Sequence, residues 1–539
     1  MRWTIKDLAA IGVFCVLLVV HVWPVALAPT SASFDYNEDG LFHVWLVTRN
    51  ARQLSSAPAQ LHDANMFYPE QDSLRFADST IFPAAVAVPT WLLSRDPQLT
   101  HNVAWLLGFL LTGLGMYALV RALTGDRFAA LLAAVLFAFN PHVATRYPHI
   151  MATYLVWLAV ACLALERMRS HDAWRWPVLL GLAVVGSAAT SGYQGVHAVF
   201  LVGALWLARG AEVAKAPSRF LARAGVAIGV AGVVGWPLLA PWFSGDGGHP
   251  VQRYATLSSY LATTSRVHWF WSEWLFEHSH GATFFPGFVA LGLASYGLWR
   301  GWRSRRRRAT VAGYALVALI GVLLSLDLPL FAMLSSVFPP AEAMRAVSRF
   351  GVLYLTGLTV LAGFGTAALR RRYVGPRGEL IALGLIALVS VELFAPPRVV
   401  PRLDVPAVYE RIARLPDTTV LLEIPLYRDG PYFGHNAPYV WASIEHGYPL
   451  VNGYGSGAPA GYELRARRLR RFPNKRSLRL LDELAVTAVV VHADRMPGGS
   501  AEAMLAALRE HRRFRLLQSD SEGRHLYRYR PRRNRVGRS

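Results

Sequence analysis

The chain has 539 residues, 53% of them hydrophobic, and a mean hydropathy of +0.29, which is too apolar for an ordinary soluble protein. Its formal net charge is +21. The basic residues cluster at the ends of apolar runs and near the C-terminus without a nucleic-acid-binding motif, so we expect no nucleic acid partner. Cys15 and Cys162 both lie inside apolar stretches, which excludes a disulfide framework and a cysteine metal site.

Eleven apolar segments are long enough, or nearly long enough, to cross a membrane, which takes about 20 apolar residues. The first resembles a signal peptide, because Arg2 and Lys6 precede it and Ala26-Leu27-Ala28 at its end resembles a small-residue cleavage site. Its long apolar core and Pro29 favour a retained anchor instead. The segments lie near residues 8–28, 99–120, 128–141, 148–165, 177–190, 194–208, 224–243, 284–299, 309–326, 350–369 and 380–395.

Lys and Arg in the short connecting segments predict a cytoplasmic N-terminus, because cationic side chains resist translocation. The six segments that are then cytoplasmic hold 21 Lys and Arg residues, and the longer outside segments before residue 396 hold nine. This orientation requires that residues 81–95 do not cross the membrane. Their two prolines and short length favour an interfacial or re-entrant segment. An odd number of spans places everything after residue 396 outside.

Two regions outside the spans have recognisable patterns. The first outer loop, residues 29–80, contains the stretch 40–54, whose apolar spacing predicts an amphipathic helix on the membrane surface. Residues 244–283 are rich in aromatic residues, which is typical of a headgroup-level belt and less often of an acceptor or lipid groove.

We expect a membrane domain over residues 1–395, an extracytoplasmic α/β domain over 396–530 and a disordered basic tail over 531–539. The fold class is therefore mainly α, a polytopic helical bundle followed by a small α/β domain. In that second domain the alternation of residues predicts strands at 419–424, 487–492, 513–518 and 525–529, and helices at 404–415, 477–485 and 500–512.

Three acidic residues, Asp35, Glu38 and Asp39, follow the outer end of the first apolar segment. Acidic residues in an exposed loop are usually solvated charge. Here they lie between a spanning helix and a surface helix, where a membrane-anchored substrate would present its headgroup. Partial desolvation at such a place raises the pKa of a carboxylate toward that of a useful general base.

Several stretches of the chain share a pattern with one superfamily. They are DGLFHVW from Asp39, LHDANMFYPE from Leu61, LTGLGMYALVRALTG, FAFNPHVATRYPH around Asn140, MRAVSRFGVLYL from Met344 and HGYPLVNGYGSGAP near the C-terminus. Together they resemble the GT-C superfamily of membrane glycosyltransferases, and more closely a bacterial GT-C-like group.

The resemblance implies a carboxylate that deprotonates an acceptor hydroxyl while a polyprenyl phosphate leaves the anomeric carbon, with inversion. Asp39 matches the acidic position and is the first candidate for the base, and Asp35 is the alternative base or a metal or acceptor ligand. Glu38 and Asp63 are candidates for substrate binding. The sequence departs from the group at Asp78 and Ser79, where a Glu-His pair is more typical, so the expected contact of Asp78 with substrate is in doubt.

A phosphate leaving group needs cationic partners. Arg345 and Arg349, four residues apart, are expected on one helical face at the outer mouth of the tenth span, with interfacial anchoring as the alternative. His142, Arg146 and His149 lie on the short outer loop between the third and fourth spans. We expect Arg146 to bind the donor phosphate and the two histidines to bind substrate, although a lone histidine there is more often structural.

Tyr454 lies in a glycine-rich loop that either binds a sugar or is ordinary turn chemistry. The sequence identifies no cofactor with certainty, and Asp35 and Asp39 would suit a shared divalent cation. The expected partners are a polyprenyl-phosphate-linked sugar, membrane lipids, and a glycan, lipid or protein acceptor, at a bacterial plasma membrane. The alternatives are a transporter or flippase of lipid-linked glycans and a non-catalytic envelope polysaccharide assembly protein. Few charged residues at mid-depth in the spans argue against transport.

Overall fold

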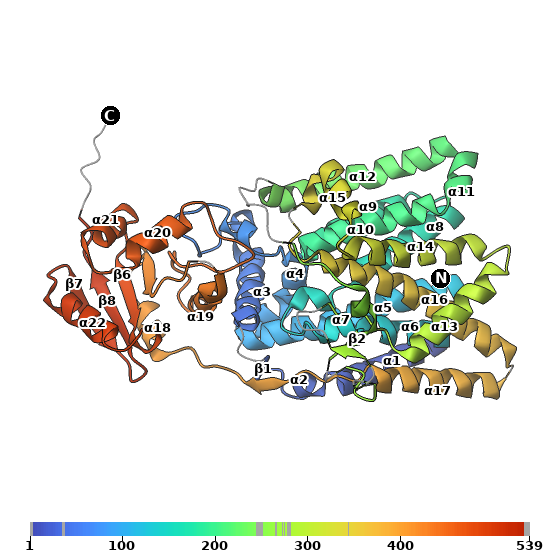
Figure 1. Cartoon of the computed structure of the whole chain (residues 1–539), viewed down its shortest axis with the longest axis horizontal. Helices are drawn as coiled ribbons and strands as arrows, with labels where there is room; N and C mark the ends of the chain where they lie inside the picture. The colour runs from blue at the N-terminus through green and yellow to red at the C-terminus, as the bar shows by residue number, and fades with distance from the viewer. Residues whose placement is uncertain are drawn as a thin grey trace.

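The computed structural model describes residues 4–34, 38–243, 252–264, 267–271, 273, 275–277, 282–342, 344–373, 375–428 and 430–532. A bundle of long helices forms one part, and a smaller region with a mixed sheet lies at one end of it (Figure 1). The expected fold class, a mainly α membrane bundle followed by a sheet-containing C-terminal region, is confirmed.

Each of the eleven predicted segments contains a helix. Six helices in the described part of the chain are long and apolar enough to cross a membrane: Pro97–Thr124, Arg127–Ala144, Ile150–Ser170, Pro217–Phe243, Arg308–Ser325 and Val347–Arg372. The number that crosses stays a prediction. The helices of the bundle are α1 (Ile5–His21), α2 (Trp23–Leu27), α5 (Pro97–Thr124), α6 (Arg127–Ala138), α7 (Pro141–Ala144), α8 (Val156–Ser170), α9 (Arg175–Thr190), α10 (Gly192–Leu207), α11 (Gly210–Lys215), α12 (Pro217–Leu239), α13 (Phe288–Trp302), α14 (Arg308–Ser325), α15 (Pro329–Val337), α16 (Gly351–Arg372) and α17 (Pro376–Glu392).

Side-chain caps explain where several of these helices begin. Thr4 and Asp7 form a capping box at α1, Asp96 caps α5, and Asn140 caps α7. Each supplies an oxygen to a backbone N–H that has no partner within its helix. Asn140 and the following Pro141 therefore start α7 with two residues between it and the end of α6.

Helix α16 packs against α13, α14 and α6. At its crossing with α13, a Cβ on Gly297 would lie 2.1 Å from the Leu361 carbonyl oxygen, and one on Gly365 would lie 2.0 Å from that of Leu293. Only glycine lets the two backbones come this close. The close packing of α16 places the segment that precedes it, η7 (Val347–Phe350), against the neighbouring helices.

The segments predicted to be cytoplasmic meet at the end of the bundle away from the sheet (Figure 1). Ion pairs connect them there: Arg121 with Asp7 at 2.8 Å, Arg127 with Glu379 at 2.9 Å, and Arg370 with Asp126. The basic loops therefore share one face, as the charge pattern predicts, while the side of the membrane on which they lie stays a prediction.

The predicted surface helix is present as α3 (Glu38–Ser56). Its residues from Gly40 to Thr48 are all buried, so the prediction that it lies on the membrane surface with one face in water is wrong. One side packs against α4 (Ile81–Ser94) and α5, and the C-terminal region covers the other. Helix α4, the predicted re-entrant segment, has 14 residues, about 21 Å in length, which is short for a hydrocarbon core of about 30 Å.

The C-terminal region contains one four-stranded sheet in the order β5-β6-β8-β7, with β5 and β6 parallel and the other pairs antiparallel. All four predicted strands and all three predicted helices are present. The elements of this region are α18 (Ala407–Ile412), β5 (Leu421–Ile424), η8 (Gly430–Asn436), α19 (Ala437–Ala442), α20 (Tyr462–Leu469), α21 (Lys475–Glu483), β6 (Ala488–His492), α22 (Ser500–Glu510), β7 (Phe514–Ser519) and β8 (Arg524–Tyr529).

The first outer loop is part of this region's packing. The Phe67 N–H donates to the Asn452 carbonyl at 3.0 Å, and the Leu450 N–H donates to the Asn65 carbonyl at 2.7 Å. Phe42 and Trp45 of α3 share a buried apolar cluster with residues of β5 and α19. Strand β1 (Ala32–Phe34) also pairs with β4 (Val399–Pro401). The domain boundary near residue 396 stays a prediction, but α3 and its loop connect the two regions through a common core.

The aromatic outer loop and the basic tail are described only in part, because Trp274 and residues 533–539 lie outside the described residues. Trp269 and Phe270 stack on each other with their ring centroids 3.5 Å apart, and both are about half exposed. Glu392 at the end of α17 accepts hydrogen bonds from the Phe288 N–H at 2.6 Å and the Trp271 indole at 3.2 Å. This carboxylate fixes the aromatic loop to the start of α13.

Candidate active site

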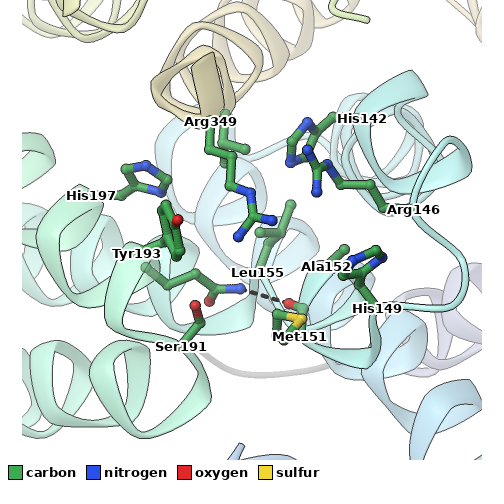
Figure 2. A pocket seen from close by; sticks show the side chains of 12 residues that line it. His142, Arg146, His149, Met151, Ala152, Leu155, Ser191, Tyr193, His197 and Arg349 are labelled. Atoms are coloured by element: carbon green, nitrogen blue, oxygen red, sulfur yellow. Dashed lines mark hydrogen bonds between the residues drawn. The ribbon is translucent and has the colours of Figure 1, made fainter. Parts of the chain in front are cut away.

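A cavity lies in the bundle next to α3. Its lining comes from α7 and the turn after it, from the junction of α9 and α10, and from η7 and α16 (Figure 2). The lining side chains are those of His142, Arg146, His149, Met151, Ala152, Leu155, Ser191, Tyr193, Gln194, His197, Arg349 and Val352.

Asp39 lies beside this cavity in the first turn of α3, held by two donors from distant parts of the chain. One carboxylate oxygen lies 3.2 Å from His149 Nε2, and the other accepts a hydrogen bond from the Tyr454 hydroxyl at 2.8 Å. The structure thus joins three predicted site residues that are far apart in sequence. The C-terminal region contributes one of them directly.

Local structure explains why these side chains meet. The His149 N–H donates to the Arg146 carbonyl at 2.9 Å, which closes a turn between α7 and η3 (Ile150–Thr153). On the opposite side, a Cβ on Gly455 would lie 2.1 Å from the Phe76 carbonyl oxygen. The glycine-rich loop therefore lies directly against the first outer loop and brings Tyr454 to Asp39.

The hydrogen bonds decide the charge of Asp39. Burial raises the pKa of this carboxyl, but the hydrogen bond from His149, the nearby histidines and the Tyr454 hydroxyl together hold the pKa well below its usual range. Burial and the neighbouring Asp39 charge in turn raise the pKa of Tyr454. At neutral pH Asp39 is therefore an ionised acceptor and Tyr454 a neutral donor.

Two histidines next to Asp39 are neutral at the same pH. Burial lowers the pKa of His149, and its hydrogen bond to Asp39 opposes this only in part. Burial, and then the neighbouring His149, lower the pKa of His43 to about 3. His43 lies one turn after Asp39 on α3, and its ring centroid is 5.5 Å from that of His149.

The cavity carries two guanidinium groups. Arg349 extends into its centre, with Tyr193 on one side and Arg146 and His142 on the other (Figure 2). Its guanidinium carbon lies 4.2 Å from the centroid of the Tyr193 ring. Burial, and then the nearby Arg349, lower the pKa of Arg146 to about 9. Two cations that repel each other in a buried cavity create a strongly anion-attracting site.

Further polar groups complete the wall. The Gln194 amide donates to the Met151 carbonyl at 2.7 Å (Figure 2). The Ser191 hydroxyl donates to Asp78 at 2.9 Å, so Asp78 supports a residue of the wall without lining the cavity itself. The His142 ring stacks on Phe284 with centroids 5.4 Å apart.

Three other predicted site residues do not line the cavity. Arg345 is exposed, is not part of the cavity lining and lies in a bend before η7, so its predicted place on one helical face with Arg349 is wrong. Asp63 is exposed and accepts a hydrogen bond from the Asp72 N–H at 3.0 Å. The Glu38 side chain packs against Gly434 of η8. Asp35 lies outside the described residues.

Among the residues that the structure describes, no group of three or more His, Cys, Asp or Glu side chains could hold a metal ion. A divalent cation shared by Asp35 and Asp39 stays a prediction, because the first of these residues is not described.

The sequence analysis missed five polar residues around the site. One is His43, whose amphipathic helix was interpreted as a surface element. The others are Ser191, Tyr193, Gln194 and His197. The signal for these four is the stretch SGYQGVH, where polar residues lie between two apolar segments. Polar side chains are costly in a membrane and usually mark a functional site there.

Comparison with solved structures identifies the fold. The arabinofuranosyltransferase AftD from Mycobacteria superposes with a TM-score of 0.60 at 14% identity, over 98% of this chain and 42% of that chain. The Archaeoglobus fulgidus oligosaccharyltransferase gives a TM-score of 0.49 at 12% identity over 90% of this chain and 70% of that one. ArnT from Cupriavidus metallidurans bound to undecaprenyl phosphate gives 0.48 at 14% identity over 98% of both chains. The superposition on AftD shows that this chain has a GT-C-like fold.

A family model described as "Domain of unknown function (DUF6311)" matches residues 9–388. The chain therefore belongs to the DUF6311 family. No curated protein matches the sequence.

Proposed function

We propose that this protein is a membrane glycosyltransferase that moves a sugar from a polyprenyl-phosphate donor to an acceptor hydroxyl. The observation that carries the proposal is the cavity that holds Arg146 and Arg349 beside the hydrogen-bonded pair of Asp39 and His149. The cavity combines an anion site with an adjacent proton acceptor. Both are needed for the transfer of a sugar from a phosphate leaving group to a hydroxyl.

The donor phosphate would bind between the two guanidinium groups. A phosphate accepts hydrogen bonds from both, and their mutual repulsion falls when the anion arrives. The negative charge on the phosphate grows as the sugar leaves, so the same contacts strengthen in the transition state. A direct displacement with the acceptor approaching from the side of Asp39 and His149 would invert the anomeric carbon.

The fold supports the same proposal. AftD is an arabinofuranosyltransferase, although at 14% identity its likeness fixes only the fold. We further propose that the basic loops are cytoplasmic, that the cavity and the C-terminal region face the outside, and that the protein lies in a bacterial plasma membrane. The acceptor would then be a glycan, lipid or protein of the envelope.

The test is release of free polyprenyl phosphate by the purified protein in nanodiscs, with a panel of polyprenyl-phosphate sugars and acceptor extracts, with and without divalent metal. We expect turnover with one donor, a loss of at least tenfold in Arg349→Gln, and rates within twofold of wild type in Arg345→Gln, the exposed control. Absence of turnover across the panel would favour a transporter or an assembly protein.

A further inference from the structure

In a sugar transfer of this kind the acceptor hydroxyl loses its proton, and a side chain must take it up. This inference rests on the proposed function and concerns which side chain takes that proton. Asp39 is the candidate from sequence, but it is not among the residues that line the cavity, whereas its partner His149 is. Both oxygens of Asp39 already accept hydrogen bonds, one from His149 and one from Tyr454.

The contact with Asp39 fixes the tautomer of His149. A neutral imidazole carries one N–H, and an ionised carboxylate only accepts hydrogen bonds. Because His149 Nε2 lies 3.2 Å from a carboxylate oxygen of Asp39, the proton of the neutral ring is on Nε2. The lone pair is then on Nδ1, which is buried and has no hydrogen-bond partner among the described residues.

We propose that His149 Nδ1 is the general base and that Asp39 is the positioning residue that orients it. The acceptor oxygen forms a bond to the anomeric carbon, and the bond from that carbon to the phosphate oxygen breaks with its electron pair on the polyprenyl phosphate. The acceptor proton moves to His149 Nδ1. The imidazolium that results is stabilised by the Asp39 carboxylate, which takes no proton itself.

The charges around His149 connect its basicity to donor binding. Asp39 and His43 face it from α3, Arg146 belongs to the same turn, and Arg349 faces it from η7. The two arginines disfavour an imidazolium while the cavity is empty. A bound phosphate neutralises them, so the ring becomes a stronger base only after the donor has arrived. Proton uptake is thereby restricted to the complex that can react.

The experiment compares His149→Gln with Asp39→Asn, and uses His171→Gln, an exposed histidine at the opposite end of the bundle, as the control. The rate of polyprenyl phosphate release at saturating donor is measured from pH 4.5 to 9, together with the affinity for undecaprenyl phosphate. We expect His149→Gln to lower kcat by 10²- to 10⁴-fold, to remove the acid limb of the profile and to leave the affinity within threefold of wild type.

Asp39→Asn should keep the acid limb but move it to lower pH, because the imidazolium loses its carboxylate. If His149→Gln keeps kcat within threefold of wild type and Asp39→Asn abolishes turnover, Asp39 is the base and the inference is wrong, while the transferase stands. If the wild type releases no polyprenyl phosphate from any donor, the proposed function fails and the inference fails with it. Should His149→Gln not fold, added imidazole must restore turnover to His149→Gly; failure to do so in the folded variant contradicts the base assignment.

Discussion

Replacing Tyr454 with phenylalanine tests whether the C-terminal region takes part in the reaction. The change removes one hydroxyl, which donates to Asp39 at 2.8 Å, and leaves the ring contacts with Phe42 and Phe433 in place. A hydrogen bond to a charged group contributes roughly 1.5–3 kcal/mol. Because the Asp39 side chain is 42% exposed, water weakens the hydrogen bond, and we expect its loss to cost about 1–2 kcal/mol.

At about 1.4 kcal/mol for each factor of ten, Tyr454→Phe should lower kcat/KM by about 5- to 30-fold. The assay is polyprenyl phosphate release in nanodiscs. Tyr432→Phe in the same region is the control, because Tyr432 is 64% exposed, and it should keep the wild-type rate. A folded Tyr454→Phe variant with kcat/KM within twofold of wild type would refute the link between the C-terminal region and Asp39.

Three further predictions follow from the same contacts. Gly455→Ala should destabilise the protein by about 1–3 kcal/mol, because a Cβ there would lie 2.1 Å from the Phe76 carbonyl oxygen. The control is Gly457→Ala, where a Cβ would have nothing within 4 Å. In a thermal shift assay this control should melt like wild type. Undecaprenyl phosphate should bind about tenfold more weakly for each pH unit above the Arg146 pKa of about 9, because binding then requires uptake of a proton. An affinity that stays flat to pH 10.5 in the wild type and is unchanged in Arg146→Gln would exclude Arg146 from the phosphate site. The Tyr454 hydroxyl stabilises the folded protein only while Asp39 is ionised. Because the folded-state pKa of Asp39 is lowered, this stabilisation is complete above the unfolded-state pKa of about 4 and is lost as the pH falls through the folded-state pKa. The difference in melting temperature between wild type and Tyr454→Phe should therefore be constant from pH 6 to 8 and shrink below pH 4.

Much of the fold follows from local patterns. The run Val489–Val491 is β-branched and buried, and the predicted strand at 487–492 matches β6 within one residue. The pairing of β1 with β4 has no such signal, because each strand has only three residues and they are far apart in the chain. The packing of the C-terminal region against α3 could not be predicted from the sequence either. An amphipathic pattern shows that one face of the helix is apolar, but it does not show what the polar face contacts. On that face, Arg49 donates hydrogen bonds to the backbone carbonyls of the first outer loop.

The candidate site was predicted in part. Asp39, Arg146, His149, Arg349 and Tyr454 were all named from the sequence, and the structure brings them together around one cavity. Arg345 was misplaced, because spacing of four implies one face only within a regular α-helix, and the chain here bends and then forms a 3₁₀ turn. The direction of the His149–Asp39 hydrogen bond depends on tertiary contacts and cannot be obtained from spacing.

The most direct test of the account is a structure of the protein in nanodiscs with undecaprenyl phosphate. We predict that the phosphate group lies in the cavity, in contact with the guanidinium groups of Arg146 and Arg349, and that His149 faces it across the space left for the sugar. A phosphate bound outside the cavity, at Arg345 or among the basic loops at the far end of the bundle, would contradict the assignment of this cavity as the donor site.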